Sequence, residues 1–381
     1  MATVEGKTTD RFEPVRAALA AHIESGDELG ASIAVDVDGV MEVDIWGGHA
    51  DEARTVPWSE DTLVSLWSTT KTLSSLAALV LVDRGALDLD RPVADYWPEF
   101  GAQGKQDIEV RHVLGHTSGL SGWQQPFTMD DLCDWPTASG RLAEQAPWWK
   151  PGTASGYHMQ TQGQLVGELV RRVSGRTLTE FVDTEIAARL DADVQIGARE
   201  ADWPRIAGLV PPQISGVPAD FDPEAIFART LLGSPARDEH VDTPQWRHAE
   251  LGALNGHSNA RGMARALSVI SRRGEADGFR LLSADTVDKI FDVQADGVDL
   301  VLGVPVRWGI GYALADPRTM PGMPTGTICF WVGRGGSIVM MDLDRRITFA
   351  YTMNRVGDGI LGSERTHSYI RHVYEALDAT N

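Results

Sequence analysis

Strand-forming patterns lie near both ends of this chain and are almost absent from its middle, and this distribution constrains the fold more than any other feature. Apolar and polar residues alternate over residues 33–37 and 41–45, with Asp38-Gly39 between them, which predicts a β-hairpin. The C-terminal third predicts four more strands joined by short turns, at residues 307–315, 327–333, 337–343 and 347–353. Together these segments predict one antiparallel sheet to which both ends of the chain contribute.

The part between the strands is predicted to be mainly helical. Helix-like spacing of apolar residues is clearest over residues 162–173, and the many prolines around it predict short helices and long loops. Because 381 residues exceed the usual length of one domain, we predict an α+β fold with an inserted domain. The sheet is flanked by helices at residues 11–25 and 363–378. The predicted sheet domain comprises residues 1–89 and 266–381, and the helix-rich inserted domain comprises residues 90–265.

Charge and hydropathy exclude several classes of function. The 54 acidic residues outnumber the 34 basic ones, and the net charge of -20 disfavours binding to nucleic acid or to an anionic membrane surface. No apolar run approaches the roughly 18 residues of a membrane span, and the N-terminal sequence lacks the apolar core of a signal peptide. We therefore expect a cytoplasmic protein that binds neither nucleic acid nor a membrane, with the oligomeric state left open.

Ser68 and Lys71 lie at the start of a helix that the apolar run at residues 73–82 predicts. The run is apolar on all sides, so this helix should be buried. Residues three apart share a helix face, which brings the Lys71 amine within reach of the Ser68 hydroxyl. Burial lowers the pKa of a lysine, and a neutral amine can act as a base toward serine. The helix N-terminus also offers a backbone N–H to an oxyanion beside Ser68. An N-cap serine followed by a helical lysine is the alternative interpretation.

Two further segments have features of a binding cleft. Tyr157 lies on a turn-rich loop that leads directly into the helix at residues 162–173, so its side chain can point into a cleft. The alternative interpretation is that Tyr157 is an aromatic residue packed in the core. The strand at residues 327–333 ends in Gly333-Arg334-Gly335-Gly336, where missing side chains let a ligand approach backbone N–H groups. A simple hairpin turn is the alternative there.

The Ser68–Lys71 segment, the Tyr157 loop and the glycine-rich turn after Gly333, taken together and in this order, resemble the motifs of one serine-reactive fold. This is the fold of class C β-lactamases, penicillin-binding proteins and especially family VIII carboxylesterases. Residues 110–120 are similar to the R-H-L-L-x-H-T-S-G-L stretch of that family, and residues 259–265 resemble its returning segment. The resemblance covers most of the chain. It implies the β-lactamase/transpeptidase-like fold, with an antiparallel sheet, flanking helices and a helical insertion.

The resemblance also implies a mechanism. Ser68 would attack an ester carbonyl, and Lys71 and Tyr157 would share the removal of its proton, with the primary base left open. The oxyanion would lie between the backbone N–H groups of Ser68 and Arg334. No metal and no organic cofactor is implied. The expected activity is that of a serine carboxylesterase that hydrolyses short-chain or small esters through an acyl-enzyme intermediate.

The sequence departs from the family pattern at positions near the substrate. The Tyr-x-Asn of the family is Tyr157-His158-Met159 here, and its Lys-Thr-Gly aligns with Trp331-Val332-Gly333, which is similar to the Trp-Gly-Gly of esterases in this fold. At Trp331-Val332-Gly333 no cation or hydroxyl remains to bind the carboxylate of a β-lactam or peptide, so a neutral ester is the expected substrate. Four more residues are candidates for the acyl and alcohol pocket, each with a core position as the alternative: Trp123, Phe127, Trp148 and Trp149.

Other functions use the same machinery or the same scaffold. An acyltransferase, or an amidase acting on D-amino-acid or β-lactam substrates, would keep Ser68, Lys71 and Tyr157. A binding protein on this fold would have lost them. Residues 256–260 approach the G-x-S-x-G elbow of α/β-hydrolases around Ser258, but the last glycine is missing and no clear strand precedes the serine.

Two pairs of residues could suggest a metal site or a disulfide. His112 and His116 have the i, i+4 spacing of a zinc site, but Val113 stands where a metalloprotease has its glutamate, so we expect structural histidines. Cys133 and Cys329 are far apart in the sequence and are expected to be reduced thiols.

Overall fold

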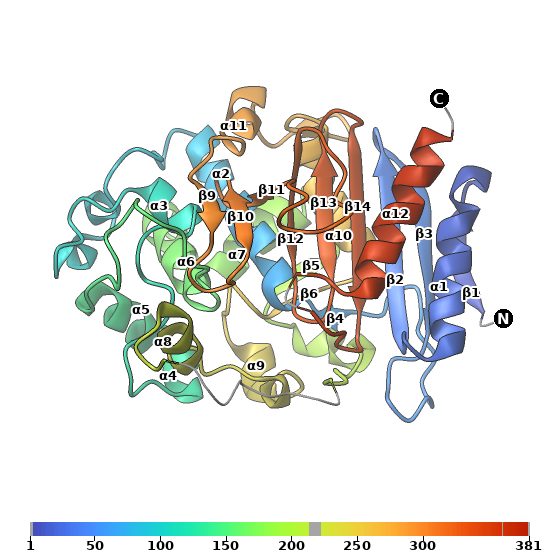
Figure 1. Ribbon diagram of the computed structural model, residues 1–381, viewed down its shortest axis with the longest axis horizontal. Helices are drawn as coiled ribbons and strands as arrows, with labels where there is room; N and C mark the ends of the chain where they lie inside the picture. Colours follow the sequence, from blue (N-terminus) through green and yellow to red (C-terminus); the bar gives the residue numbers. More distant parts are fainter. Residues whose placement is uncertain (1–2, 213–221, 360, 380–381) are drawn as a thin grey trace.

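The computed structural model describes residues 3–212, 222–359 and 361–379, and its centre is a nine-stranded sheet (Figure 1). The strands follow the order β1-β3-β2-β14-β13-β12-β11-β10-β9, and all neighbours are antiparallel. The pairing of β14 with β2 joins the C-terminal strands to the N-terminal ones, so the predicted sheet from both ends of the chain is confirmed. The strands are β1 Val4–Thr8, β2 Gly30–Val37, β3 Val40–Gly48, β9 Ala295–Val298, β10 Pro305–Trp308, β11 Ala313–Leu314, β12 Ile328–Val332, β13 Ile338–Asp342 and β14 Ile347–Met353.

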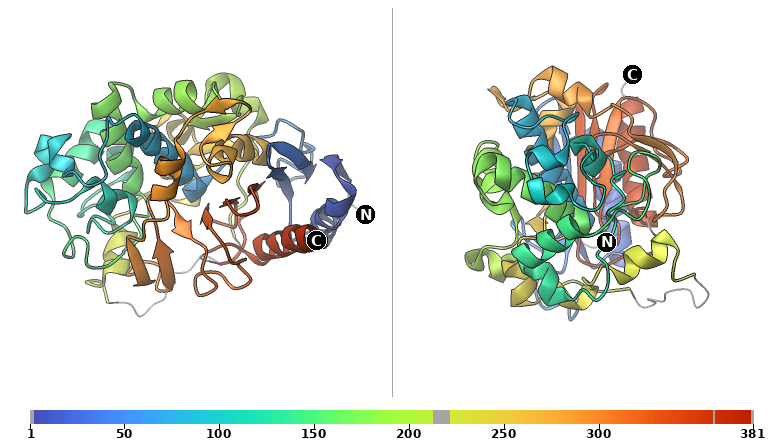
Figure 2. Two further views of the ribbon diagram at one scale, coloured as in Figure 1. Left: turned by 90° about the horizontal axis from the view of Figure 1, so that it is seen from above. Right: turned by 90° about the vertical axis from the view of Figure 1, so that its left-hand side faces the viewer.

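Helices cover both faces of this sheet (Figure 2). On one face α10 (Ala260–Ser271) packs against β2, β13 and β14, and on the other α1 (Glu13–Ser25) and α12 (Glu364–Asp378) lie side by side. Successive residues of a strand point to opposite faces. In β13, for example, Val339 joins the core under α10 and Met340 joins the core under α12. Burial on both faces explains why the central strands are continuous apolar runs.

The other helices form a layer beside the sheet, at the left in Figure 1. They are η2 Trp67–Thr70, α2 Lys71–Asp83, α3 Val110–Leu114, α4 Met129–Cys133, α5 Trp135–Glu144, α6 Thr161–Ser174, α7 Leu178–Val182, α8 Ile226–Leu232, α9 Pro244–His248 and α11 Ala284–Lys289. The boundaries of the inserted domain stay a prediction, because α2 packs against α6 in a shared core. Among the described residues, none of the helices combines the length and the apolar composition that a membrane crossing requires.

Several short strands differ from the sequence-based prediction. The predicted strand at residues 307–315 is divided into β10 and β11 by a turn in which Gly309 N–H donates to the Tyr312 carbonyl and Gly311 has a φ of +80°. β1 and β9 were not predicted, since both contain glycine and polar residues. A second sheet in the middle of the chain was also not predicted, because strands of two or three residues show no periodicity: β4 Val64–Ser65, β5 Val194–Ile196 and β6 Gly256–Ser258.

Candidate active site

Ser68 lies in η2, the tight turn that leads into α2, and not in the α-helix itself. Trp67 before it has a φ of +49°, a left-handed conformation in which a bulky residue is strained. The Trp67 ring is held by an edge contact with Trp246, with 5.2 Å between the ring centres. Ser68 is partly exposed, whereas Trp67 and Thr69 are buried. The turn therefore presents a single accessible hydroxyl at the end of a buried helix.

Lys71, one turn later, is fully buried, and within the described residues it has no ion pair. Its Nζ lies 3.0 Å from Ser68 Oγ, 2.8 Å from the Met159 carbonyl oxygen and 3.0 Å from the Ala253 carbonyl oxygen. Burial lowers the pKa of this amine well below the ordinary 10.5. The two carbonyls can only accept hydrogen bonds, so they take the two N–H groups of a neutral amine. Its lone pair is then left for the Ser68 hydroxyl.

Tyr157 lies beside this pair. Its hydroxyl accepts the indole N–H of Trp331 at 3.0 Å and has a side-chain hydrogen bond with Ser68. Lys71 Nζ is 4.8 Å from the centre of the tyrosine ring. Burial raises the pKa of the Tyr157 hydroxyl far above its ordinary value. Tyr157 is therefore protonated at neutral pH and can donate that proton to a leaving group.

Asp299, in the loop between β9 and β10, fixes the backbone of the tyrosine loop. Its buried carboxylate accepts the backbone N–H of Tyr157 at 2.9 Å, the N–H groups of Val301 and Leu302, and the indole N–H of Trp308 at 3.0 Å. The Trp308 ring in turn stacks on Tyr157 at an angle of 9°. Sequence reasoning missed Asp299, because most of its partners are backbone groups that leave no pattern in the sequence.

The histidines of residues 110–120 also have structural partners. The His116 carbonyl accepts the Gly156 N–H at 3.0 Å, and its ring Nδ1 accepts the His158 N–H at 3.1 Å, so this segment holds the tyrosine loop. Nδ1 of His112 accepts the Glu109 N–H at 3.1 Å at the start of α3. Both rings use a nitrogen lone pair for the backbone, which agrees with the structural role predicted for them.

The turn between β12 and β13 lies against the Ser68 turn. A Cβ on Gly333 would be 2.8 Å from Thr69 Oγ1, so only glycine permits this approach. Ser337 Oγ, at the other end of the turn, is 3.0 Å from the same Thr69 oxygen. In the described parts of the chain, the backbone N–H groups of Ser68 and Arg334 have no hydrogen-bond partner. Unpaired N–H groups of this kind can bind an oxyanion.

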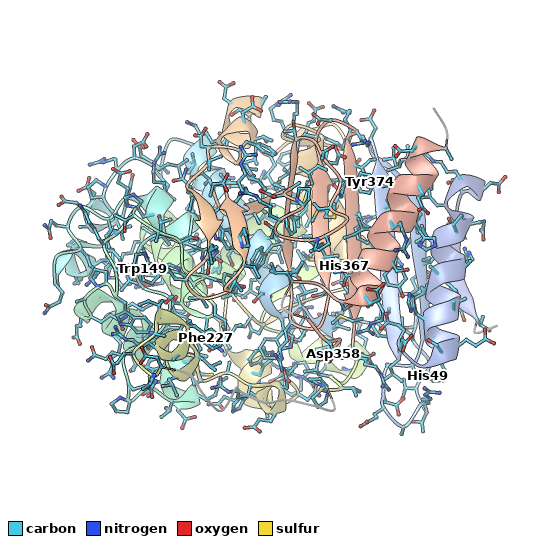
Figure 3. All side chains as sticks on the ribbon, viewed as in Figure 1. His49, Trp149, Phe227, Asp358, His367 and Tyr374 are labelled. Carbon is cyan, nitrogen blue, oxygen red and sulfur yellow. The ribbon has the colours of Figure 1, made fainter. Side chains whose placement is uncertain are left out.

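The structure divides the candidate pocket residues by exposure. Met159, Trp148 and Trp149 are partly exposed. In Figure 3, Trp149 lies in the helical half of the molecule, opposite Tyr374 on α12. The others are buried, namely Trp123, Phe127, His158, Trp331, Val332 and Gly333.

Three of the buried candidates have specific partners inside the protein. Trp123 stacks on Phe127 with 4.5 Å between ring centres and an angle of 3°, which is the position of a core residue. His158 Nε2 is 2.6 Å from Ser118 Oγ. Trp331 is 2% exposed, so its first contact is with Tyr157 and not with solvent, and its place in the substrate pocket stays a prediction.

Ser258 is excluded as a nucleophile by its burial. Contrary to expectation, the strand β6 does run into it and α10 follows. However, Ser258 is fully buried, and its hydroxyl donates to the Asp193 carbonyl at 2.8 Å. Cys133 and Cys329 are both free thiols.

Comparisons with known proteins agree with this fold. Esterase/beta-lactamase LipL of Mycobacterium tuberculosis is 34% identical over 373 residues, which cover 93% of this chain and 83% of that protein. The crystal structure of a family VIII carboxylesterase matches with a TM-score of 0.92 and 33% identity over 98% of this chain and 100% of that one. A penicillin-binding protein homologue from Caulobacter crescentus matches with a TM-score of 0.90 and 34% identity over 98% and 100% of the two chains. A family model described as Beta-lactamase matches residues 15–368, and the chain therefore belongs to the Beta-lactamase family.

Proposed function

We propose that this protein is a serine carboxylesterase of the Ser-x-x-Lys type that hydrolyses small, uncharged esters through an acyl-enzyme at Ser68. The observation that carries the proposal is the environment of Lys71. Two carbonyl oxygens occupy its N–H groups, and the serine hydroxyl lies 3.0 Å from its nitrogen. LipL and the family VIII carboxylesterase, both named as esterases, support the same activity.

In the acylation step, Ser68 Oγ bonds to the ester carbonyl carbon while its proton passes to Lys71 Nζ. The oxyanion lies between the N–H groups of Ser68 and Arg334. The carbon–oxygen bond to the alcohol then breaks, and Tyr157 gives its proton to the departing oxygen. The tyrosinate recovers a proton from the Lys71 ammonium, which restores the starting charges.

Deacylation uses the same groups in reverse roles. Water attacks the acyl carbon and loses a proton to the neutral Lys71 or through Tyr157. The bond to Ser68 Oγ breaks, and that oxygen takes the proton back. Because the pKa of Lys71 is lowered and that of Tyr157 is raised, we infer that Lys71 is the first proton acceptor and Tyr157 the first proton donor.

Labelling with a fluorophosphonate tests the nucleophile. We expect mass spectrometry of the labelled peptides to find the adduct on Ser68, and we expect Ser68→Ala to abolish both labelling and hydrolysis of 4-nitrophenyl butyrate. Ser258→Ala is the matched control and should still be labelled. An adduct on Ser258 would refute the assignment.

A comparison of substrates tests the preference for esters. Rates over 4-nitrophenyl esters from acetate to dodecanoate should fall as the acyl chain lengthens, and ampicillin should be a poor substrate, since Met159 and Val332 replace the polar groups of the family pattern. Ampicillin turnover as fast as that of the butyrate ester would show that these substitutions do not set specificity.

A further inference from the structure

Arg334 forms a bidentate ion pair with Asp238. Its Nε lies 2.6 Å from Asp238 Oδ1 and its Nη2 lies 2.8 Å from Asp238 Oδ2. The Arg334 side chain is 45% exposed, whereas that of Asp238 is 14% exposed. A bidentate pair of this kind fixes the guanidinium and occupies the edge that would otherwise bind a second carboxylate.

Both ends of this ion pair are anchored to walls of the candidate active site. Arg334 follows Gly333 in the turn that packs on the Ser68 turn. Asp238 is two residues beyond Ala236, whose backbone exchanges two hydrogen bonds of 3.1 Å with the Gln160 side chain. Gln160 directly follows Met159, whose carbonyl binds Lys71. The pair therefore links the oxyanion turn to the end of the tyrosine loop.

Arg334 also supplies a cation directly after the three residues that align with the Lys-Thr-Gly pattern. The positions of that pattern hold Trp331, Val332 and Gly333, but a guanidinium stands on the next residue. Left alone, it would offer a fork-shaped site for a substrate carboxylate on the residue whose backbone N–H is proposed to bind the oxyanion. Asp238 fills that site with a carboxylate of the protein itself.

We propose that Asp238 is a specificity-determining residue which neutralises Arg334 and thereby selects esters without a carboxylate. This inference rests on the proposed esterase function. An anionic substrate must displace Asp238 from Arg334 and leave a largely buried carboxylate without its partner, which is unfavourable. A neutral ester meets no such cost. Removing the Asp238 charge should therefore free the guanidinium and admit anionic substrates.

Matched pairs of substrates test this proposal. The first pair is 4-nitrophenyl pentanoate and the mono-4-nitrophenyl ester of glutarate, which differ by a carboxylate on the acyl side. The second pair places the carboxylate on the alcohol side: the butyrate ester of 4-hydroxybenzoate and that of methyl 4-hydroxybenzoate. The quantity to compare is the ratio of kcat/KM for the anionic ester to that for the neutral ester.

We expect Asp238→Asn and Asp238→Ala to raise this ratio at least fivefold for one of the pairs, and 0.5 M NaCl to reduce the gain through screening. The double variant Asp238→Asn/Arg334→Gln should lose the gain. Asp38→Asn is the matched control, because it removes the acidic partner of Arg346 in a surface ion pair. It should leave the ratio unchanged.

Several results would overturn the proposal. A rise below fivefold in folded Asp238 variants, or an equal rise in Asp38→Asn, would do so. The double variant Asp238→Asn/Arg334→Gln gives a second test, since replacing a neutral ion pair by two uncharged side chains predicts the wild-type ratio, and a fall below that ratio would show that Arg334 already binds anions. Wild-type hydrolysis of the neutral esters, lost in Ser68→Ala, reports on the proposed function separately.

Discussion

Two lysines of this protein are equally inaccessible to solvent, but their amines have different partners. Lys105 Nζ donates to three carbonyl oxygens, those of Ala102, Ala143 and Gln145, at 2.8, 2.9 and 2.5 Å. Lys71 Nζ contacts two carbonyl oxygens and the Ser68 hydroxyl. Carbonyl oxygens can only accept, so the three partners of Lys105 match an ammonium, whereas the Ser68 hydroxyl can accept from an ammonium or donate to the lone pair of a neutral amine.

This comparison shows that burial alone does not make a lysine a base. Burial lowers the pKa of Lys105 to about 8, so this amine keeps its proton at pH 7 and joins the backbone near Ala102 to the segment that contains Ala143 and Gln145. Burial also lowers the pKa of Lys71 well below its ordinary value, and one of the partners of this amine is a nucleophile, the Ser68 hydroxyl. The hydroxyl partner, which can give up its proton, thus distinguishes the catalytic lysine from the structural one.

The largest expected effect is that of Lys71→Met. Removing the amine leaves Ser68 without a base, and we expect kcat to fall by about three powers of ten or more. Steady-state hydrolysis of 4-nitrophenyl butyrate measures this effect, and circular dichroism reports on the fold. If folded Lys71→Met keeps more than about a tenth of the wild-type kcat, the distinction between the two lysines fails.

Tyr157→Phe should have the next largest effect. The change deletes one hydroxyl, and we expect a loss of about two to three powers of ten in kcat, the usual contribution of a positioned acid–base group. The double variant with Lys71→Met should be little worse than either single variant, because the two residues act as a unit. Near wild-type kcat at an unchanged Tm would instead leave Lys71 as the sole acid–base group.

The sequence predicted the local part of this site. Ser68 and Lys71 are three residues apart on one helix, so their contact follows from helix geometry. The family motifs added Tyr157 and the turn at Gly333. The strands in the N-terminal hairpin and in the C-terminal third of the chain were predictable for the same reason, since alternation within a strand is a local pattern.

The groups that decide the chemistry could not be predicted in this way. The carbonyls of Met159 and Ala253 are backbone atoms, which every residue type carries, and they reach Lys71 from distant parts of the chain. Asp299 and Asp238 act through contacts that only the tertiary structure creates. For the same reason, the sequence does not show which backbone carbonyls surround the Lys71 and Lys105 amines.

The pH dependence of activity also tests the comparison between Lys71 and Lys105. The protonated Lys71 amine has no lone pair, so kcat/KM should fall about tenfold per pH unit as the pH drops below the pKa of Lys71. Because burial lowers that pKa, the loss should occur well below pH 10.5. The titration of Lys105 near pH 8 should leave kcat/KM unaffected. A single activity midpoint close to 10.5 would mean that Lys71 is not desolvated in the working enzyme.

The smallest expected effect on kcat is that of Lys105→Met, which matches Lys71→Met in chemistry. Methionine fills a similar volume but leaves the three carbonyls without a donor, which costs about 2–4 kcal/mol of unfolding free energy. Urea denaturation should therefore show a lower midpoint, while the kcat of the folded enzyme stays within about threefold of wild type, because Lys105 contacts no residue of the candidate site. An unchanged urea midpoint, or a tenfold loss of kcat in folded protein, would mean that the hydrogen-bond partners of the two amines do not distinguish the structural lysine from the catalytic one.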